Sequence, residues 1–125
     1  MEYYKLIISP YGSYNYNGAS NIEMDIIGHF LSSDIGCNNI YPYKKWALND
    51  LEEAIGGNLT DLYKENGCIV LTDLYSQEKV PTKFKIPIHQ FVQLLDDWKS
   101  KVCSTKPKEV IIKQENGQYI IETAN

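Results

Sequence analysis

The sequence contains no arginine, and all twelve of its basic residues are lysine. Arginine is the preferred side chain for bidentate recognition of phosphate and guanine, because its planar fork of donors matches both. A protein that reads nucleic acid without arginine would be unusual. The composition therefore argues against a nucleic-acid partner.

Long apolar runs are also missing. No stretch approaches the roughly 18–20 apolar residues of a membrane-spanning helix. Residues 1–5 lack the basic start and the apolar stretch of a secretory signal. With 43% hydrophobic and 22% charged residues, the chain has the composition of a globular protein. We expect a complete cytoplasmic protein with no membrane partner, in which residues 1–125 form a single domain.

Cysteine is scarce and widely spaced. Cys37, Cys68 and Cys103 are an odd number and form no C-x-x-C pair. Because zinc sites and disulfide frameworks use closely patterned cysteines, this spacing argues against both. We expect buried thiols in a reducing compartment, and no metal site.

Residues suited to catalysis are few. The only histidines are His29 and His89. Asp25 stands four residues before His29, so the pair could share a helical face and orient the imidazole or bind a metal, but a third ligand is missing. His89 is expected at the surface, in the first turn of a helix. Since nucleophile motifs and glycine-rich phosphate loops are also missing, the sequence predicts a non-enzymatic protein without a cofactor.

Tyrosine, in contrast, is abundant, with ten residues in the chain. Five of them fall in residues 10–18 and 38–43, where their neighbours are mostly Ser, Asn, Gly and Pro. This composition is typical of protein-binding loops, because Tyr gives a large contact area at low entropic cost and small polar residues give adaptable hydrogen bonds. The predicted partner-binding tyrosines are Tyr11, Tyr14, Tyr16, Tyr41 and Tyr43.

Acidic residues gather in the middle of the chain. Residues 50–78 hold seven acids and a single lysine, whereas residues 79–113 hold eight lysines and three acids. Clustered carboxylates either solubilise a surface or steer a basic partner toward it. As partner-binding acids we predict Asp50, Glu52, Glu53 and Asp61.

Apolar periodicity predicts one strand and two helices in the first half of the chain. The strand is a β-branched and aromatic run that ends at Pro10. Ser20 and Glu23 have the spacing of a capping box, and Asn49 starts a second capping signal. Residues 58–66 are ambiguous, and a further helical turn through Leu59, Leu62 and Tyr63 is one interpretation. The expected elements are a strand over 3–9 and helices over 21–32 and 49–55.

The second half has clearer patterns. Asn-Gly pairs at 66–67 and 116–117 predict tight turns, the second of them inside a hairpin. Pro87 suits the first turn of a long amphipathic helix. The expected order is β-α-α-β-β-α-β-β, an α+β fold with a mainly antiparallel sheet of about five strands packed with two to three helices. The expected elements are strands over 68–75, 80–86, 109–114 and 118–122 and a helix over 87–102.

Residues 82–98 run from a strand into a proline-initiated helix that ends in Leu-Leu-x-x-Trp, and residues 106–122 add Lys-Pro-Lys-Glu-Val-Ile-Ile and a hairpin. This block resembles the C-terminal half of bacterial immunity proteins from polymorphic and contact-dependent growth-inhibition toxin systems. The resemblance implies a small, acidic, cytoplasmic protein without catalytic activity. It also implies binding to one cognate toxin domain, commonly a nuclease, whose active site or docking surface is blocked.

The leading hypothesis is therefore an immunity protein that neutralises a basic toxin domain by occluding it. A first alternative is a small enzyme or enzyme subunit that uses His29 or His89. A second is a self-associating module, with a homodimer formed through the strand at residues 118–123, because an uncovered strand edge is a template for pairing.

Overall fold

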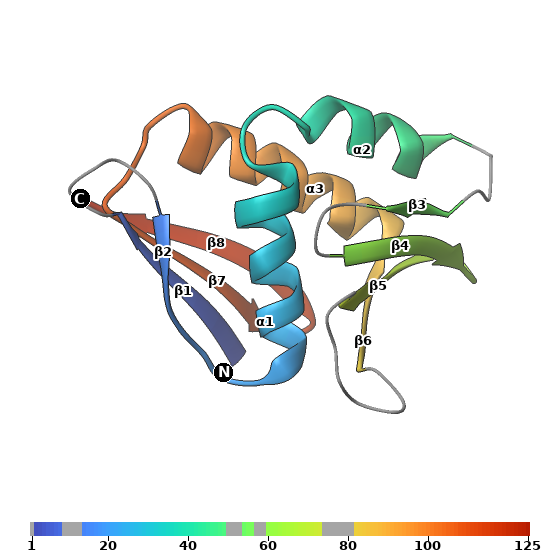
Figure 1. The fold of residues 1–125 in the computed structure, drawn as a ribbon, viewed down its shortest axis with the longest axis horizontal. Helices are drawn as coiled ribbons and strands as arrows, with labels where there is room; N and C mark the ends of the chain where they lie inside the picture. The colour runs from blue at the N-terminus through green and yellow to red at the C-terminus, as the bar shows by residue number, and fades with distance from the viewer. Residues whose placement is uncertain (1, 9–13, 50–53, 57–59, 74–81) are drawn as a thin grey trace.

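The computed structural model describes residues 2–8, 14–49, 54–56, 60–73 and 82–125 (Figure 1). The strands in these residues are β1 (Glu2–Ile8), β2 (Tyr14–Ala19), β3 (Ile55–Gly56), β4 (Thr60–Glu65), β5 (Cys68–Asp73), β6 (Lys83–Pro87), β7 (Glu109–Glu115) and β8 (Gln118–Ala124). The helices are α1 (Ile22–His29), α2 (Ile40–Leu48) and α3 (Ile88–Trp98), and α1 and α3 continue as π-helical turns over Phe30–Ile35 and Lys99–Cys103.

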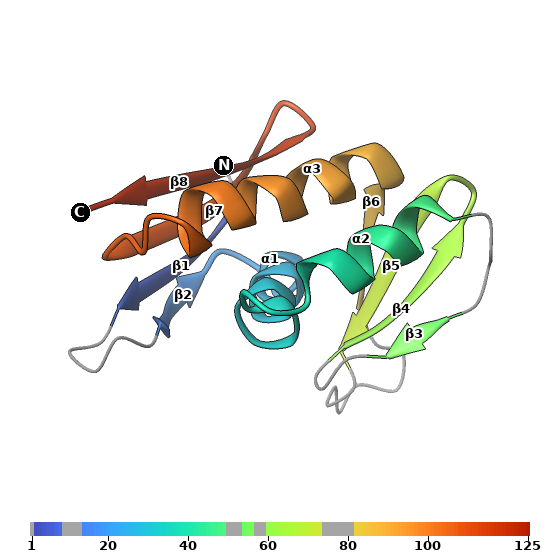
Figure 2. The same ribbon diagram turned by 90° about the horizontal axis from the view of Figure 1, so that it is seen from above.

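The described strands form two antiparallel sheets of four strands each. The terminal sheet has the order β2-β1-β7-β8 and contains the first and last strands, and the middle sheet has the order β3-β4-β5-β6. Helix α1 contacts both sheets, α3 bridges them, and α2 packs on α3 (Figures 1 and 2). The expected α+β class with antiparallel pairing is confirmed, but the strands are divided between two sheets instead of forming one sheet of five.

Both predicted Asn-Gly turns are confirmed. Asn66 and Gly67 have φ angles of 49° and 76°, and Asn116 and Gly117 have 52° and 77°. Two successive positive φ angles define the turn whose twist suits a two-residue hairpin, and Asn and Gly tolerate them best. The turns set the register of their hairpins, with Glu65 opposite Cys68 in one and Glu115 opposite Gln118 in the other.

One apolar core joins the two sheets through the helices. In β1 and β7 burial alternates, and both strands contact α1. Strand β5 has three consecutive buried residues and lies inside its sheet. Figure 2 shows α1 lying between the sheets. The fully buried residues with the largest side chains are Trp98, Tyr4, Phe30, Phe91, Leu6, Met24, Ile27, Leu31, Ile35, Leu62, Ile69 and Leu71.

Helix α1 begins one residue later than the capping box predicts. The side chain of Asn21, not Ser20, caps the helix, and its Oδ1 accepts a hydrogen bond from the Met24 amide at 2.9 Å. Ser20 Oγ instead accepts from the backbone amide of Tyr3 at 2.8 Å, which ties the helix start to β1. Farther along α1, a Cβ at Gly28 would overlap the Tyr4 ring, so only glycine lets the ring lie against the helix.

Several predicted boundaries in the first half of the chain are wrong. Residues 38–43 were expected in a loop, but residues 40–48 form α2. Ile40, Tyr43 and Trp46 recur at helical spacing, and Pro42 falls in the first turn. Residues 60–65 form β4 and not a helical turn, and residues 55–56, expected at the end of a helix, form the short strand β3. Residues 10–18 were expected in a loop, but residues 14–19 form the strand β2, which pairs with β1.

The expectation that the cysteines are free thiols is wrong for two of them. Cys37 and Cys103 form a disulfide across 66 residues of sequence, with their Cα atoms 5.7 Å apart. The turn after α1 and the end of α3 meet there, because Trp98 Nε1 donates a hydrogen bond to the Gly36 carbonyl at 2.8 Å. Cys68 is a free cysteine and only half-buried.

Candidate protein-binding surface

The structure describes the side chains of four of the nine predicted partner-binding residues. Tyr16 and Tyr41 are exposed, at 55% and 71%, and Asp61 is exposed on β4. Tyr43 is buried. Tyr14 is described as a backbone residue of β2 only. Outside the described residues lie Tyr11, Asp50, Glu52 and Glu53.

Tyr43 belongs to the core and not to a binding surface. Its side chain is 6% exposed, and its ring packs edge-on against Phe30 at 5.2 Å between centroids. Burial raises the pKa of its phenol, with a smaller contribution from the nearby Asp34. Direct contact with a partner would require the ring to leave the core, so Tyr43 is removed from the predicted set.

Tyr41 lies on the opposite face of the same helix. Ile40, Tyr43, Trp46 and Ala47 point inward, whereas Tyr41 and Leu48 are 71% and 60% exposed. Residues seven apart project from one side of an α-helix, about 10.5 Å apart along its axis. With Lys44, Lys45 and Asn49 the two side chains border an open hollow of about 380 Å³. These five residues are named here the α2 surface.

Contacts to neighbouring elements hold the α2 surface in place. Lys44 Nζ lies 2.9 Å from Asp96 Oδ1 on α3. At the end of the helix, Lys64 Nζ donates to the backbone and side-chain oxygens of Asn49, at 2.8 and 3.0 Å, and lies over the Trp46 ring. The surface is therefore preformed, which lowers the ordering cost of binding.

Tyr16 lies in a separate aromatic cluster. Its ring centroid is 5.5 Å from that of Tyr4 and 5.5 Å from that of His29. Strand β2 lies on the other side of α1 from α2 (Figure 1). The structure thus does not bring Tyr16 and Tyr41 onto one surface, although their sequence neighbourhoods have similar composition.

The aromatic cluster also explains His29. The predicted pair with Asp25 is present, with His29 Nδ1 3.3 Å from Asp25 Oδ1 and 2.9 Å from the Asp25 carbonyl oxygen. The ring packs edge-on against Tyr4 at 5.3 Å. Burial raises the pKa of Tyr4 to about 12, although a hydrogen bond with Ser32 opposes the shift. The His29 ring is thus held by packing against Tyr4 and Tyr16 and by its contact with the Asp25 carbonyl oxygen one helical turn earlier. These contacts give His29 a structural role.

The described residues contain no group of three or more His, Cys, Asp or Glu side chains arranged to hold a metal ion. Nor does any helix in the described part of the chain have the length and apolar character needed to cross a membrane.

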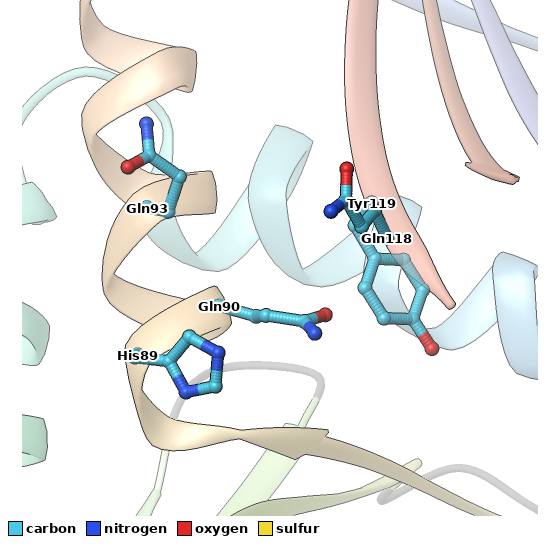
Figure 3. Close-up of a pocket in the computed structure, with 5 residues that line it drawn as sticks. All are labelled: His89, Gln90, Gln93, Gln118 and Tyr119. Atoms are coloured by element: carbon cyan, nitrogen blue, oxygen red, sulfur yellow. The ribbon is translucent and has the colours of Figure 1, made fainter. Parts of the chain in front are cut away.

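A second hollow was missed by sequence reasoning. It has a volume of about 380 Å³ and is lined by His89, Gln90 and Gln93 of α3 and by Gln118 and Tyr119 of β8. Gln90 extends from α3 toward Tyr119 (Figure 3). His89 was expected at the surface and is exposed. In the sequence, Gln90, Gln93 and Gln118 look like ordinary surface residues. They form a common lining only because the hairpin places β8 beside α3.

Comparison of the chain with protein-family models, with curated proteins and with solved structures found no match.

Proposed function

We propose that this protein is an immunity protein that binds a cognate toxin domain, a nuclease by expectation, and blocks its active site or docking surface. The α2 surface is the proposed centre of contact. The single observation that carries the proposal is the pair Tyr41 and Leu48, two large side chains held in water on one side of a well-packed helix. The sequence resemblance of residues 82–122 to immunity proteins supports the same function.

The size of the two exposed side chains supports a tight contact. A tyrosine buries roughly 150–250 Å² when fully enclosed. With Tyr41 71% exposed, a partner can still cover most of that area, which is worth about 3 kcal/mol at ~25 cal/mol per Å². A few buried aromatic and apolar residues usually carry most of the energy of an interface. Tyr41 and Leu48 fit that role.

Acids supply the proposed attraction to a basic toxin. Asp50, Glu52 and Glu53 lie within five residues after Leu48 in the sequence, and Asp61 is exposed on β4. Their negative potential would steer a basic nucleic-acid-binding cleft toward the protein and compete with the toxin's substrate. The association rate should therefore fall as salt is added, because salt screens exposed charges. On the α2 surface itself, the charge of Lys44 is paired with Asp96.

The compartment of the protein is a separate part of the proposal. Immunity against a nuclease is exerted in the cytoplasm, where thiols are kept reduced. The disulfide between Cys37 and Cys103 conflicts with that setting. Acid trapping and alkylation of the protein from intact cells measures the disulfide-bonded fraction. If most of the protein in intact cells carries the disulfide, the proposed site of action changes from the cytoplasm to an oxidising compartment.

The proposal is tested with the product of the gene immediately upstream, which on this proposal ends in a toxin domain. Co-expression should protect growth, and titration calorimetry should give a one-to-one complex. The double variant Tyr41→Ala/Leu48→Ala should lose protection while keeping the fold. Tyr3→Ala, which removes an exposed tyrosine of β1, is the matched control. Absence of binding, or full toxicity in co-expression with the wild-type protein, would sink the idea.

A further inference from the structure

The hollow between α3 and β8 has an unusual lining. Three of its five residues are glutamines, Gln90, Gln93 and Gln118, and the others are His89 and Tyr119. An amide both donates and accepts hydrogen bonds without carrying a charge. None of the five is an acid, a lysine or an arginine, so the lining holds no permanently charged side chain and His89 is its one titratable imidazole. The chemistry therefore favours an uncharged polar ligand.

Two of the glutamines in this lining have side-chain oxygens that could accept a hydrogen bond from a ligand. Gln93 Nε2 donates a hydrogen bond to Asp97 Oδ1 at 3.0 Å. This bond does not use the side-chain oxygen of Gln93, which can accept a hydrogen bond from a ligand. The Gln90 side-chain oxygen is buried and has no hydrogen-bond partner among the described residues. A buried amide oxygen without a donor is unfavourable, and native proteins rarely leave one. Reorientation of the Gln90 amide toward a bound donor would remove that defect.

The backbone of β8 beside the hollow is also open. Glu115 and Gln118 flank the two-residue turn and are opposite each other, so they form a hydrogen-bonded pair. Pairs alternate along an antiparallel hairpin, which makes Tyr119 and Gln114 a non-hydrogen-bonded pair. The N–H and C=O groups of Tyr119 therefore point away from β7. Because β8 is the last strand of its sheet in the described part of the chain, they point away from the other described strands.

The rest of this side of β8 is less accessible. Two residues farther along β8, Lys101 Nζ donates to the Ile121 carbonyl oxygen at 3.2 Å. A lysine laid over an edge is a recognised device against pairing with other chains. Self-association along the whole strand, as the sequence alternative requires, would have to displace Lys101. The position beside Tyr119 is free of this obstacle.

We propose that this hollow binds a short, extended and uncharged peptide segment. The backbone of one peptide residue pairs with Tyr119 at the edge of β8, which is the strand-addition mode of peptide recognition. Residues directly paired in antiparallel strands point their side chains to the same face. The Tyr119 ring faces the core and borders the hollow, so the paired peptide residue directs its side chain there. Glutamine or asparagine fits the surrounding amides.

This inference is independent of the proposed function, because it requires no toxin. It is tested on the full-length protein by nuclear magnetic resonance with three capped tripeptides. The first is acetyl-Thr-Gln-Thr-amide, the second has Glu at the centre, and the third has an N-methylated central Gln. The Glu peptide tests the neutrality of the site, and the N-methyl peptide removes the backbone donor while keeping the side chain.

The first peptide should shift the amide resonances of Gln118 and Tyr119 saturably and slow hydrogen exchange at the Tyr119 amide. The other two should bind at least tenfold more weakly. Gln93→Ala, an exposed position on α3, should weaken the first peptide by severalfold and leave the spectrum of the free protein folded. Shifts elsewhere, no saturable shift, or equal binding of the three peptides would overturn the proposal.

Discussion

Removal of the disulfide between Cys37 and Cys103 should lower the free energy of unfolding by about 4 kcal/mol. The perturbation is the double variant Cys37→Ser/Cys103→Ser, or reduction of the wild-type protein. The disulfide closes a loop of 66 residues that contains α2, the whole middle sheet and α3. Its loss lets the unfolded chain explore conformations that the crosslink forbids, while the folded contacts stay in place.

The magnitude comes from loop-closure entropy. For a loop of this length the unfolded chain gains about 15 cal/mol/K when the crosslink is removed, or about 4 kcal/mol at 25 °C. Urea unfolding of a domain of this size has a slope of about 2 kcal/mol per M, so the midpoint should fall by about 2 M. The free-energy figure follows from the 66-residue separation, and the midpoint shift follows from that figure and the urea slope.

The assay is urea denaturation followed by tryptophan fluorescence, with and without reductant. Cys68→Ser is the matched control, because Cys68 is a free cysteine, and its midpoint should move by less than ~0.5 M. Reduction should lower the midpoint of the wild type and leave the double variant unchanged. The reasoning is refuted if the non-reduced protein yields three alkylatable thiols on unfolding, or if the oxidised wild type and the double variant share one midpoint.

Three further predictions follow from other parts of the molecule. Gly28→Ala should destabilise the fold by about 3 kcal/mol in thermal or urea unfolding, because the new methyl group overlaps the Tyr4 ring; a cost below ~1 kcal/mol would contradict the packing. Stability should decline as the pH rises from 10 toward 12, since burial raises the folded pKa of Tyr4 to about 12 from 10.0, and the unfolded state then loses its proton first. The loss is about 2 kcal/mol, and Tyr4→Phe should flatten the decline in urea midpoints across this pH window; an unchanged slope would contradict the assignment. If α2 is the interface, Tyr41→Ala should weaken binding to the toxin domain about 30-fold by calorimetry, corresponding to about 2 kcal/mol, and Leu48→Ala should weaken it less. Tyr3→Ala should leave the affinity within about twofold, and equal losses from all three variants would count against the α2 surface.

The second half of the fold could be predicted because its signals are local. The pair at Asn116 identifies a hairpin from two residues, and the pair at Asn66 identifies a turn. The apolar residues from Phe91 to Trp98 recur at helical spacing. In each case the residues that determine the element lie within a few positions of one another. Tertiary contacts then agree with the local preference.

The first half was harder because local and tertiary signals differ. Tyr41 and Tyr43 have identical side chains two positions apart, and only the packing of α2 on α3 and on Phe30 decides that one is buried and the other exposed. Pro42 made the segment resemble a loop, although proline is tolerated in the first turn of a helix. The same difficulty applies to the candidate binding surface. The composition of residues 38–43 was enough to select Tyr41, whereas Leu48 joins it only because both lie on the exposed side of α2.

The disulfide could not be predicted from spacing. Cys37 and Cys103 meet because two helices end at the same place, and a separation of 66 residues carries no trace of that geometry. The hollow beside β8 is equally non-local, because it exists only where the hairpin approaches α3.

The placement of both chain ends in the terminal sheet has a mechanical consequence. Glu2 is opposite Gln114 at one end of the sheet, and Ala124 is opposite Glu109 at the other. A pull between the two ends therefore acts along β1, β7 and β8, across hydrogen bonds that run perpendicular to the strands. The strands are therefore loaded in shear, and all of these hydrogen bonds resist the force together. The middle sheet lies outside this path, so stretching the protein by its ends leaves α2 and its exposed side chains unloaded until the terminal sheet ruptures.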